Sequence, residues 1–255
     1  MAERARYLYA ITRNVDPSPL GSTPALSGGR LDVVEHRGLT AVVSDVDLRE
    51  FGQEGLRENL ERLEWLEKVA RGHDTVVQAV ASLGPTAPLR LATICLDDEG
   101  VRRRLDEWHD ALHVVLDRVE GRMEWSVKAF ADPVQAGVDT SGVPEPAQGG
   151  GAAYLQRKKS EQTAREHREA DAARVAGEIH DALAASSSAS RRLPAQDPQL
   201  TGHTGTMTLN GAYLVDLDEV AEFEATFHRL QKEHPDAALA LQGPWPPYSF
   251  AVLEQ

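Results

Sequence analysis

The chain has 255 residues, a formal net charge of −13, and hydrophobic and charged shares of 41% and 26%. This length is enough for two domains that each bury a core, and the composition is typical of globular proteins. The negative charge argues against a nucleic-acid partner, because affinity for phosphates comes from Lys and Arg side chains.

The N-terminus runs directly into a short alternating segment and shows no apolar core of a signal peptide. Elsewhere, no apolar run approaches the length that is needed to cross a bilayer. We therefore expect a cytoplasmic protein that has no membrane partner.

Residues 1–120 are predicted to form an α+β domain that opens with three β-rich runs. The second and third runs meet at Arg37-Gly38, which predicts a tight hairpin. The three predicted strands span residues 7–12, 31–36 and 39–46.

The rest of this domain is predicted to contain two helices with a strand between them. Apolar residues recur at helical spacing from Leu56 to Leu83, and Gly84-Pro85 should end that helix. Residues 88–96 form a continuous apolar strand candidate. Asp97 is placed to cap the second helix, whose apolar positions run through residues 101–119.

Residues 121–255 are predicted to form a ferredoxin-like domain, which makes the whole chain an α+β protein of two domains. The predicted order is strand, helix, strand, strand, helix, strand, which is the split βαβ arrangement. The elements are a strand at 123–129, a loop at 132–151, a long helix at 152–185, strands at 191–195 and 207–215, a helix capped by Asp218, and terminal strands at 237–242 and 248–253.

The best candidate for a metal site is the pair His109 and His113, one helical turn apart, as in the zinc-protease pattern His-Glu-x-x-His. The intervening acid is Asp110 and no third ligand has a recognisable spacing, so half-exposed surface histidines are the simpler interpretation. His73 falls within an apolar stripe and is expected to be a core histidine bonded to backbone. Cys95 is expected to be a buried thiol. We predict no catalytic residues, no metal and no cofactor.

Two segments are candidates for partner binding. Trp245-Pro246-Pro247-Tyr248 combines prolines that rigidify a turn with aromatic side chains that offer contact area at low entropy cost. Arg157-Lys158-Lys159 lies on the long helix, which is only weakly amphipathic and so must face water or a partner along much of its length. Alternatively, the first segment is only a structural corner, and the second is one turn of a solvated helix.

The sequence resembles the gas vesicle protein F/L family, whose members are accessory proteins of gas vesicle formation. The resemblance covers essentially the whole chain. It is carried by Tyr7–Ile11, Leu39–Ser44, Arg62–Glu67 continuing through His73, Pro88–Thr93, Glu124–Lys128, Tyr154–Lys159, Leu209–Val215 and Gly243–Phe250.

One departure is visible, because Leu91-Ala92 stands where the family is expected to have Phe-Gly. The resemblance implies a ferredoxin-like C-terminal part and a non-enzymatic role in nucleating or assembling the vesicle shell. It also implies two kinds of partner, namely the small hydrophobic shell protein and other accessory proteins of the gas vesicle. It supplies no catalytic residues.

Two other functions remain open from the sequence. Ferredoxin-like folds carry many activities, so the chain is also compatible with an enzyme of the haem or small-molecule oxygenase type. A small-molecule sensor is the third possibility. A bound haem or metal would favour the enzyme, and a ligand-dependent melting temperature would favour the sensor.

Overall fold

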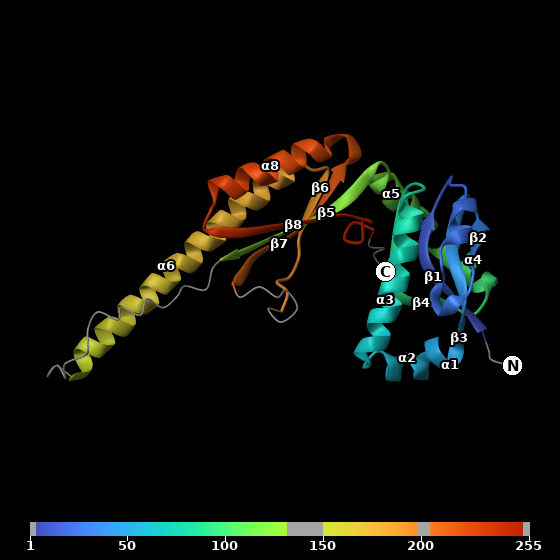
Figure 1. Ribbon diagram of the computed structural model, residues 1–255, viewed down its shortest axis with the longest axis horizontal. Coiled ribbons are helices and arrows are strands. Elements are labelled where there is room, and N and C mark those ends of the chain that lie inside the picture. The colour runs from blue at the N-terminus through green and yellow to red at the C-terminus, as the bar shows by residue number, and fades with distance from the viewer. Residues whose placement is uncertain (1–3, 132–149, 198–204, 252–255) are drawn as a thin grey trace. The chain divides into compact units, whose positions relative to one another are not determined.

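The computed structural model describes residues 4–131, 150–197 and 205–251, apart from the side chains of Ser27, residues 150–153 and Arg157. The chain forms two compact units, which we call the first unit (residues 1–124 and 244–255) and the second unit (residues 125–243). Among the described residues, each unit contains a four-stranded sheet, and Figure 1 shows helices beside both sheets. The predicted α+β class is confirmed.

The first unit is built on an antiparallel sheet with the strand order β2-β3-β1-β4. The predicted hairpin between β2 and β3 is confirmed, and its turn residues Arg37 and Gly38 both have positive φ, at 48° and 79°. Such a turn matches the twist of the two strands. Its elements are β1 (Arg4–Thr12), β2 (Leu31–His36), β3 (Leu39–Asp47), α1 (Leu48–Phe51), α2 (Gln53–Asn59), α3 (Leu63–Ala81), β4 (Thr86–Cys95), α4 (Asp98–Glu107) and α5 (His109–Val119).

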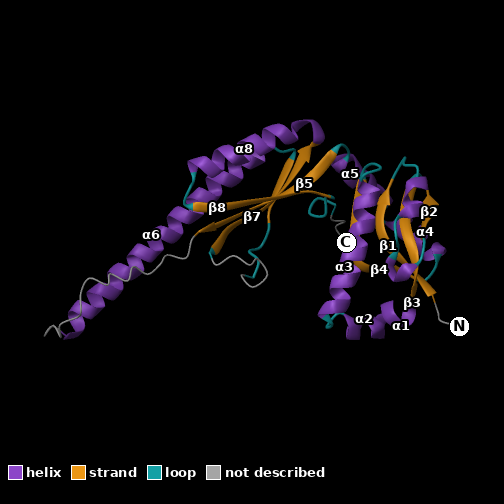
Figure 2. Ribbon diagram, in the orientation of Figure 1, coloured by secondary structure: helices purple, strands orange, loops and turns teal. Residues whose placement is uncertain are grey.

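Helices cover both faces of this sheet, so its central strands are buried on both sides (Figure 2). In β1, Leu8 and Ile11 pack toward α4 and α5, whereas Tyr7 and Tyr9 pack toward α1 and α3. The register shifts between Leu8 and Ala10, where the strand has a bulge. These two apolar layers make β1 a nearly continuous buried strand.

Both helices predicted for this unit are interrupted. Arg62 is extended between α2 and α3, and the apolar residues on either side of it, Leu60 and Leu63, are 48% and 77% exposed. Both leucines fit the helical spacing of apolar residues in the sequence, but neither packs in a core. The prediction of a single helix over residues 56–83 is therefore wrong. The second helix breaks at Trp108 into α4 and α5. The predicted cap is confirmed, since Asp97 accepts a hydrogen bond from the Gly100 amide at 2.7 Å.

The second unit has the strand order β6-β7-β5-β8. In the described residues, its helices and strands follow the chain order β-α-β-β-α-β, which is the arrangement of ferredoxin-like domains. Its apolar core lies between the sheet and both helices and includes Trp125, Ile179, Tyr213 and Phe223. Its elements are β5 (Arg122–Ala131, whose first residues belong to the first unit), α6 (Gly150–Ala185), β6 (Ala189–Arg192), β7 (Thr206–Asp216), α8 (Val220–Glu233) and β8 (Ala237–Trp245).

Three details of this part of the chain differ from the sequence expectations. Asp218 lies in a short 3₁₀ turn, and α8 begins after Glu219 without a side-chain cap. Residues 248–251 form a turn rather than the start of a strand, because the prolines before them have no amide to donate to a sheet. Residues 244–255 group with the first unit, whereas the sequence placed them with the ferredoxin-like domain. Most of the predicted loop, residues 132–149, lies outside the described residues.

Ala92 in β4 has a φ of +60°, a conformation in which an L-residue with a Cβ is strained. This is the position where the family resemblance led us to expect Gly. We predict that Ala92→Gly stabilises the chain by about 0.5–1 kcal/mol, because the relief of strain exceeds the extra entropy cost of Gly. Equilibrium urea denaturation measures this change. Ala87→Gly, in ordinary buried strand, is the matched control and should destabilise, and a lower stability for both variants would contradict the prediction.

Candidate functional site

The aromatic and proline residues near the C-terminus form a compact turn, residues 245–251, which we call the C-terminal turn. Pro246 and Pro247 are buried, whereas Trp245 and Tyr248 are 41% and 38% exposed. The Tyr248 amide donates to the Pro246 carbonyl at 2.8 Å, and two later amides donate to the Pro247 carbonyl. The backbone of the turn is therefore held by its own hydrogen bonds, with two aromatic side chains at the surface.

A buried carboxylate anchors the C-terminal turn. Glu124 is only 7% exposed, and it accepts hydrogen bonds from the Ser249 amide at 2.7 Å and the Ser249 hydroxyl at 2.6 Å. Hydrogen bonds to an ionised acceptor are stronger than neutral ones. Phe250 and Ala251 follow as buried residues, and Ala251 joins the core beneath α4 and α5. This anchoring fixes the position of the aromatic residues beside it.

The Tyr248 hydroxyl donates to Asp74 Oδ1 on α3, at 3.3 Å. Partial burial raises the pKa of Tyr248, and the adjacent Asp74 charge raises it further, so the hydroxyl stays protonated at neutral pH. Trp245 and Tyr248 thus offer a neutral, amphipathic contact surface. Aromatic side chains with few rotatable bonds lose little entropy when a partner covers them.

Neither Glu124 nor Asp74 was identified from the sequence as part of this site. Glu124 lies 125 positions before Ser249, and nothing in its local sequence distinguishes it from a solvated carboxylate. One local signal was available, since Glu124 lies next to Trp125 at the start of a predicted strand. The sequence around Glu124 does not show which residue its carboxylate contacts. A contact with Ser249, 125 positions later, is set by the tertiary structure.

The basic segment belongs to the second unit, whereas the C-terminal turn belongs to the first. Lys158 and Lys159 are exposed on α6, and the side chain of Arg157 lies outside the described residues. Every described side chain from residue 154 to 171 is exposed, including Tyr154 and Leu155. Figure 1 shows α6 continuing well past the sheet of its own unit. Ion pairs one helical turn apart, such as Arg165–Glu169 at 2.7 Å, stabilise the helical conformation of this exposed part of α6.

The histidine pair on α5 has the spacing that the sequence indicated, with ring centroids 4.6 Å apart. His109 Nδ1 lies 2.9 Å from Asp110 Oδ1, which lowers the pKa of that carboxyl. Within residues 4–131, 150–197 and 205–251, no group of three or more His, Cys, Asp or Glu residues is arranged to hold a metal ion.

His73 is buried, at 4% exposure, as expected for a core histidine. Nδ1 lies 3.0 Å from the Tyr7 hydroxyl, a side-chain contact that the sequence did not indicate. Nε2 has no hydrogen-bond partner of good geometry, although the Leu89 backbone lies near enough to favour the charged ring slightly. Burial dominates and lowers the pKa of His73 to about 4. The ring is therefore neutral at physiological pH.

The single cysteine and a groove in the second unit are the remaining features of chemical interest. Cys95 is buried, and burial raises the pKa of its thiol, which keeps it unreactive. An open groove of about 570 Å³ lies in the second unit between α6 and the connection from α8 to β8. Its lining mixes apolar residues such as Phe130 and Val175 with charges of both signs such as Arg168 and Asp236.

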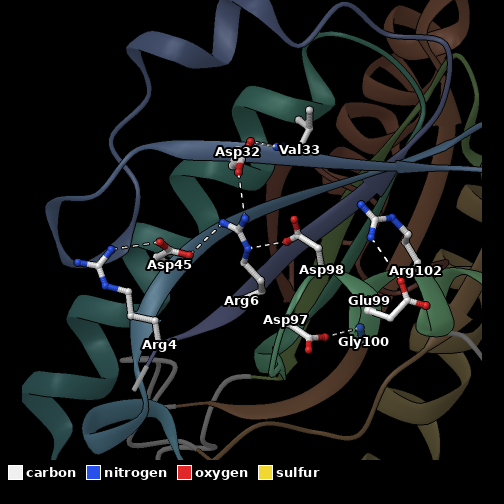
Figure 3. A network of polar contacts seen from close by, with 10 residues as sticks. All are labelled: Arg4, Arg6, Asp32, Val33, Asp45, Asp97, Asp98, Glu99, Gly100 and Arg102. Carbon is white, nitrogen blue, oxygen red and sulfur yellow. Dashed lines mark hydrogen bonds and ion pairs between the residues drawn. The ribbon is translucent and has the colours of Figure 1, made fainter. Parts of the chain in front are cut away.

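A charge network in the first unit surrounds Arg6 (Figure 3). Its guanidinium lies 2.7 Å from Asp98, 2.9 Å from Asp45 and 3.2 Å from Asp32, and its side chain is largely buried. Arg4 adds a second contact to Asp45. These partners come from β2, β3 and the start of α4, so Arg6 on β1 connects four elements. We interpret the network as structural, because the carboxylates are directed at the arginine rather than toward a vacant site.

Within the part of the chain that the structure describes, no helix is long and apolar enough to span a bilayer.

Comparison with known proteins gives matches over almost the whole chain. The family model described as gas vesicle synthesis protein GvpL/GvpF matches residues 5–252. Gas vesicle protein L of Streptomyces sp. (strain CB03234) is 35% identical, over 99% of this chain and 95% of its own length. Gas vesicle protein F of the same strain is 28% identical over 96% and 98%, and gas vesicle protein F2 of Halobacterium salinarum is 24% identical over 99% and 94%.

Two crystal structures have the same fold as this chain. GvpF from Anabaena sp. PCC7120 aligns with a TM-score of 0.70 at 18% identity, over 99% of this chain and 98% of that one. GvpF from Microcystis aeruginosa aligns with a TM-score of 0.69 at 17% identity, over 98% and 99%. At this identity the likeness concerns the fold alone.

Proposed function

Because this chain belongs to the GvpL/GvpF family of gas vesicle synthesis proteins and has a role in gas vesicle formation, we propose that it acts as a non-enzymatic assembly factor. Its partners in this proposal are the small hydrophobic shell protein and other gas vesicle accessory proteins, and its place of action is the cytoplasm. The observation that carries the proposal is the anchored C-terminal turn with exposed Trp245 and Tyr248.

An apolar shell subunit is prone to aggregate before it is assembled into the vesicle. A subunit with a strongly apolar face aggregates unless that face is covered, so a binding partner that covers it keeps the subunit available. Trp and Tyr are enriched among the residues that dominate binding energy at interfaces. The C-terminal turn presents both on a backbone that its own hydrogen bonds hold in place, which limits the entropy lost on binding.

The exposed length of α6 is the second contact region in this proposal. Lys158 and Lys159 lie there next to the exposed apolar residues Tyr154 and Leu155. This combination supports contact with a partner that has both apolar and acidic groups. We include Arg157 because it continues the same basic segment of the sequence.

Co-expression of the tagged chain with the major shell protein, followed by affinity purification, tests the proposal. We expect the shell protein to co-purify in soluble form. Trp245→Ala with Tyr248→Ala should weaken capture by about 30-fold, since loss of two aromatic anchors costs roughly 2 kcal/mol or more. If the double variant captures the shell protein as well as the wild type does, the C-terminal turn is not part of the interface. The double variant Lys158→Glu with Lys159→Glu tests, in the same assay, whether α6 contributes to capture of the shell protein.

A matched control separates contact from folding. Leu63→Ala with Leu217→Ala removes two exposed apolar side chains elsewhere and should leave capture unchanged. The circular dichroism spectrum and melting temperature should be the same for all variants. If the aromatic variant instead melts early, the turn has a structural role. If folded wild-type chain captures neither the shell protein nor another gas vesicle component, the proposed role as a binding protein is wrong.

A further inference from the structure

The strand β4 contains a wide bulge at residues 89–92, which we call the β4 bulge. In the pairing of β4 with β1, these residues lie opposite Tyr9 alone. Ala92, at the end of the β4 bulge, is the strained residue with a φ of +60°. Such strain persists only where the surrounding structure imposes it, and it is typical of functional sites.

Buried polar side chains hold the β4 bulge in place. The Ala92 amide donates a hydrogen bond to the Tyr7 hydroxyl at 3.2 Å, and this hydroxyl lies 3.0 Å from His73 Nδ1. Because the amide can only donate, the hydroxyl oxygen accepts from Ala92 and its proton is available to His73. Tyr7 and His73 are both buried, so these contacts are shielded from water and fix the backbone at Ala92.

Arg90 lies inside the β4 bulge and is exposed. It is the only charged residue of β4, and its carbonyl accepts a hydrogen bond from the Thr93 hydroxyl at 2.7 Å. Among the described residues, its guanidinium has no ion pair and no hydrogen bond. The β4 bulge therefore presents an unpaired guanidinium on a backbone that is held at Ala92 and at Thr93.

Protection of a sheet edge explains only part of this arrangement. Among the described strands, β4 is at an edge of its sheet, and a bulge with a charged side chain discourages unwanted pairing there. Edge protection requires neither a strained residue nor a buried polar network, and strain costs stability. Bulges also direct a side chain at a functional site. The strain at Ala92 thus favours a contact role for Arg90.

We propose that Arg90 binds the carboxylate of an acidic side chain on another gas vesicle protein. This inference rests on the proposed function, which supplies the class of partner. A guanidinium matches the planar carboxylate and donates two parallel hydrogen bonds to it. Salt screens exposed charges beyond about 8 Å at physiological ionic strength, so a partner meets the local charge of β4, which is that of Arg90 alone. The net charge of −13 disfavours a polyanion such as nucleic acid in this place.

Co-expression of the tagged full-length chain with the complete set of gas vesicle proteins, followed by affinity purification, tests this contact. We expect Arg90→Glu to weaken capture of one component by about tenfold or more, because it places two carboxylates against each other. Arg90→Lys should retain part of the capture, since it keeps the charge but loses the paired hydrogen bonds. The matched control is Arg30→Glu, which changes the charge equally at another exposed arginine and should leave capture unchanged.

Charge reversal in the captured component identifies the carboxylate. Its acidic residues are replaced by Lys one at a time, and one replacement should restore capture by Arg90→Glu. If Arg90→Glu captures every component as well as the wild type does, or if no reversal restores capture, the inference is wrong while the proposed function stands. A wild-type chain that captures no component overturns both.

Tyr7→Phe tests whether the Tyr7 hydroxyl positions the β4 bulge for binding. The variant should weaken capture when Arg90 is present but should have no further effect in the Arg90→Glu background. Amides of residues 89–92 should also exchange faster with solvent, whereas those of β7 should not change. Equal losses of capture in both backgrounds would show that the hydroxyl has a structural role only.

Discussion

Replacement of Phe250 by Ala should lower the free energy of unfolding of the first unit by about 3–5 kcal/mol, the usual cost of removing a buried phenyl ring. Phe250 is 4% exposed, and the next residue, Ala251, joins the core beneath α4 and α5. The loss therefore falls on the unit that contains the beginning of the chain, although Phe250 lies near its end.

Hydrogen exchange measured by mass spectrometry locates this effect. Peptides from β1, in the first unit, should exchange faster in Phe250→Ala, whereas peptides from β7 in the second unit should change little. Trp245→Ala is the control, because its side chain is already 41% exposed and its removal leaves no cavity. Faster exchange confined to β7 would show that the C-terminal turn belongs with the second unit instead.

Acidification between pH 6.5 and 4 should destabilise the first unit by about 3 kcal/mol through His73 alone. The pKa of His73 falls from its ordinary value of 6.5 to about 4 in the folded chain. The unfolded chain therefore binds a proton below pH 6.5 that the folded chain does not bind until about pH 4. Stability is fully present above pH 6.5 and is lost as pH falls through this window.

Urea denaturation at several pH values measures this contribution as the difference between wild type and His73→Gln. The variant removes the titrating group, so its stability should fall less steeply between pH 6.5 and 4, even though altered packing lowers its stability at pH 7. Val77→Ala, a buried position on the same helix that carries no titrating group, should lower stability but keep the wild-type slope. Equal slopes in wild type and His73→Gln would mean that the buried ring gains a proton as readily as the unfolded one.

The features that the sequence predicted correctly depend on local signals. The Arg37-Gly38 turn and the Asp97 cap are each fixed by a few neighbouring residues, and both are present in the structure. Most of the element order of the second unit follows from the alternation in its strands and from the helical apolar period of α8, whereas α6 is only weakly amphipathic. The broken helices were missed because the apolar period continues across each break, and Leu60 and Leu63 carry that period while remaining exposed.

The candidate site was predictable only in part. The aromatic residues and prolines at 245–248 could be identified from the sequence, but the exposure of Trp245 and Tyr248 could not. Their anchoring could not, because Glu124 and Asp74 reach the turn from distant positions in the chain. The Arg6 network was missed for the same reason, since its three carboxylates come from separate elements.

The grouping of residues 244–255 with the first unit has a consequence for synthesis on the ribosome. A nascent chain emerges from its N-terminus, so all of residues 125–243 appear before Phe250 and Ala251 can fill their places. The second unit can complete its core while the first unit still lacks its last buried residues. The first unit, most of which precedes the second in the chain, is thus completed after it, and its core stays incomplete until Phe250 and Ala251 have emerged.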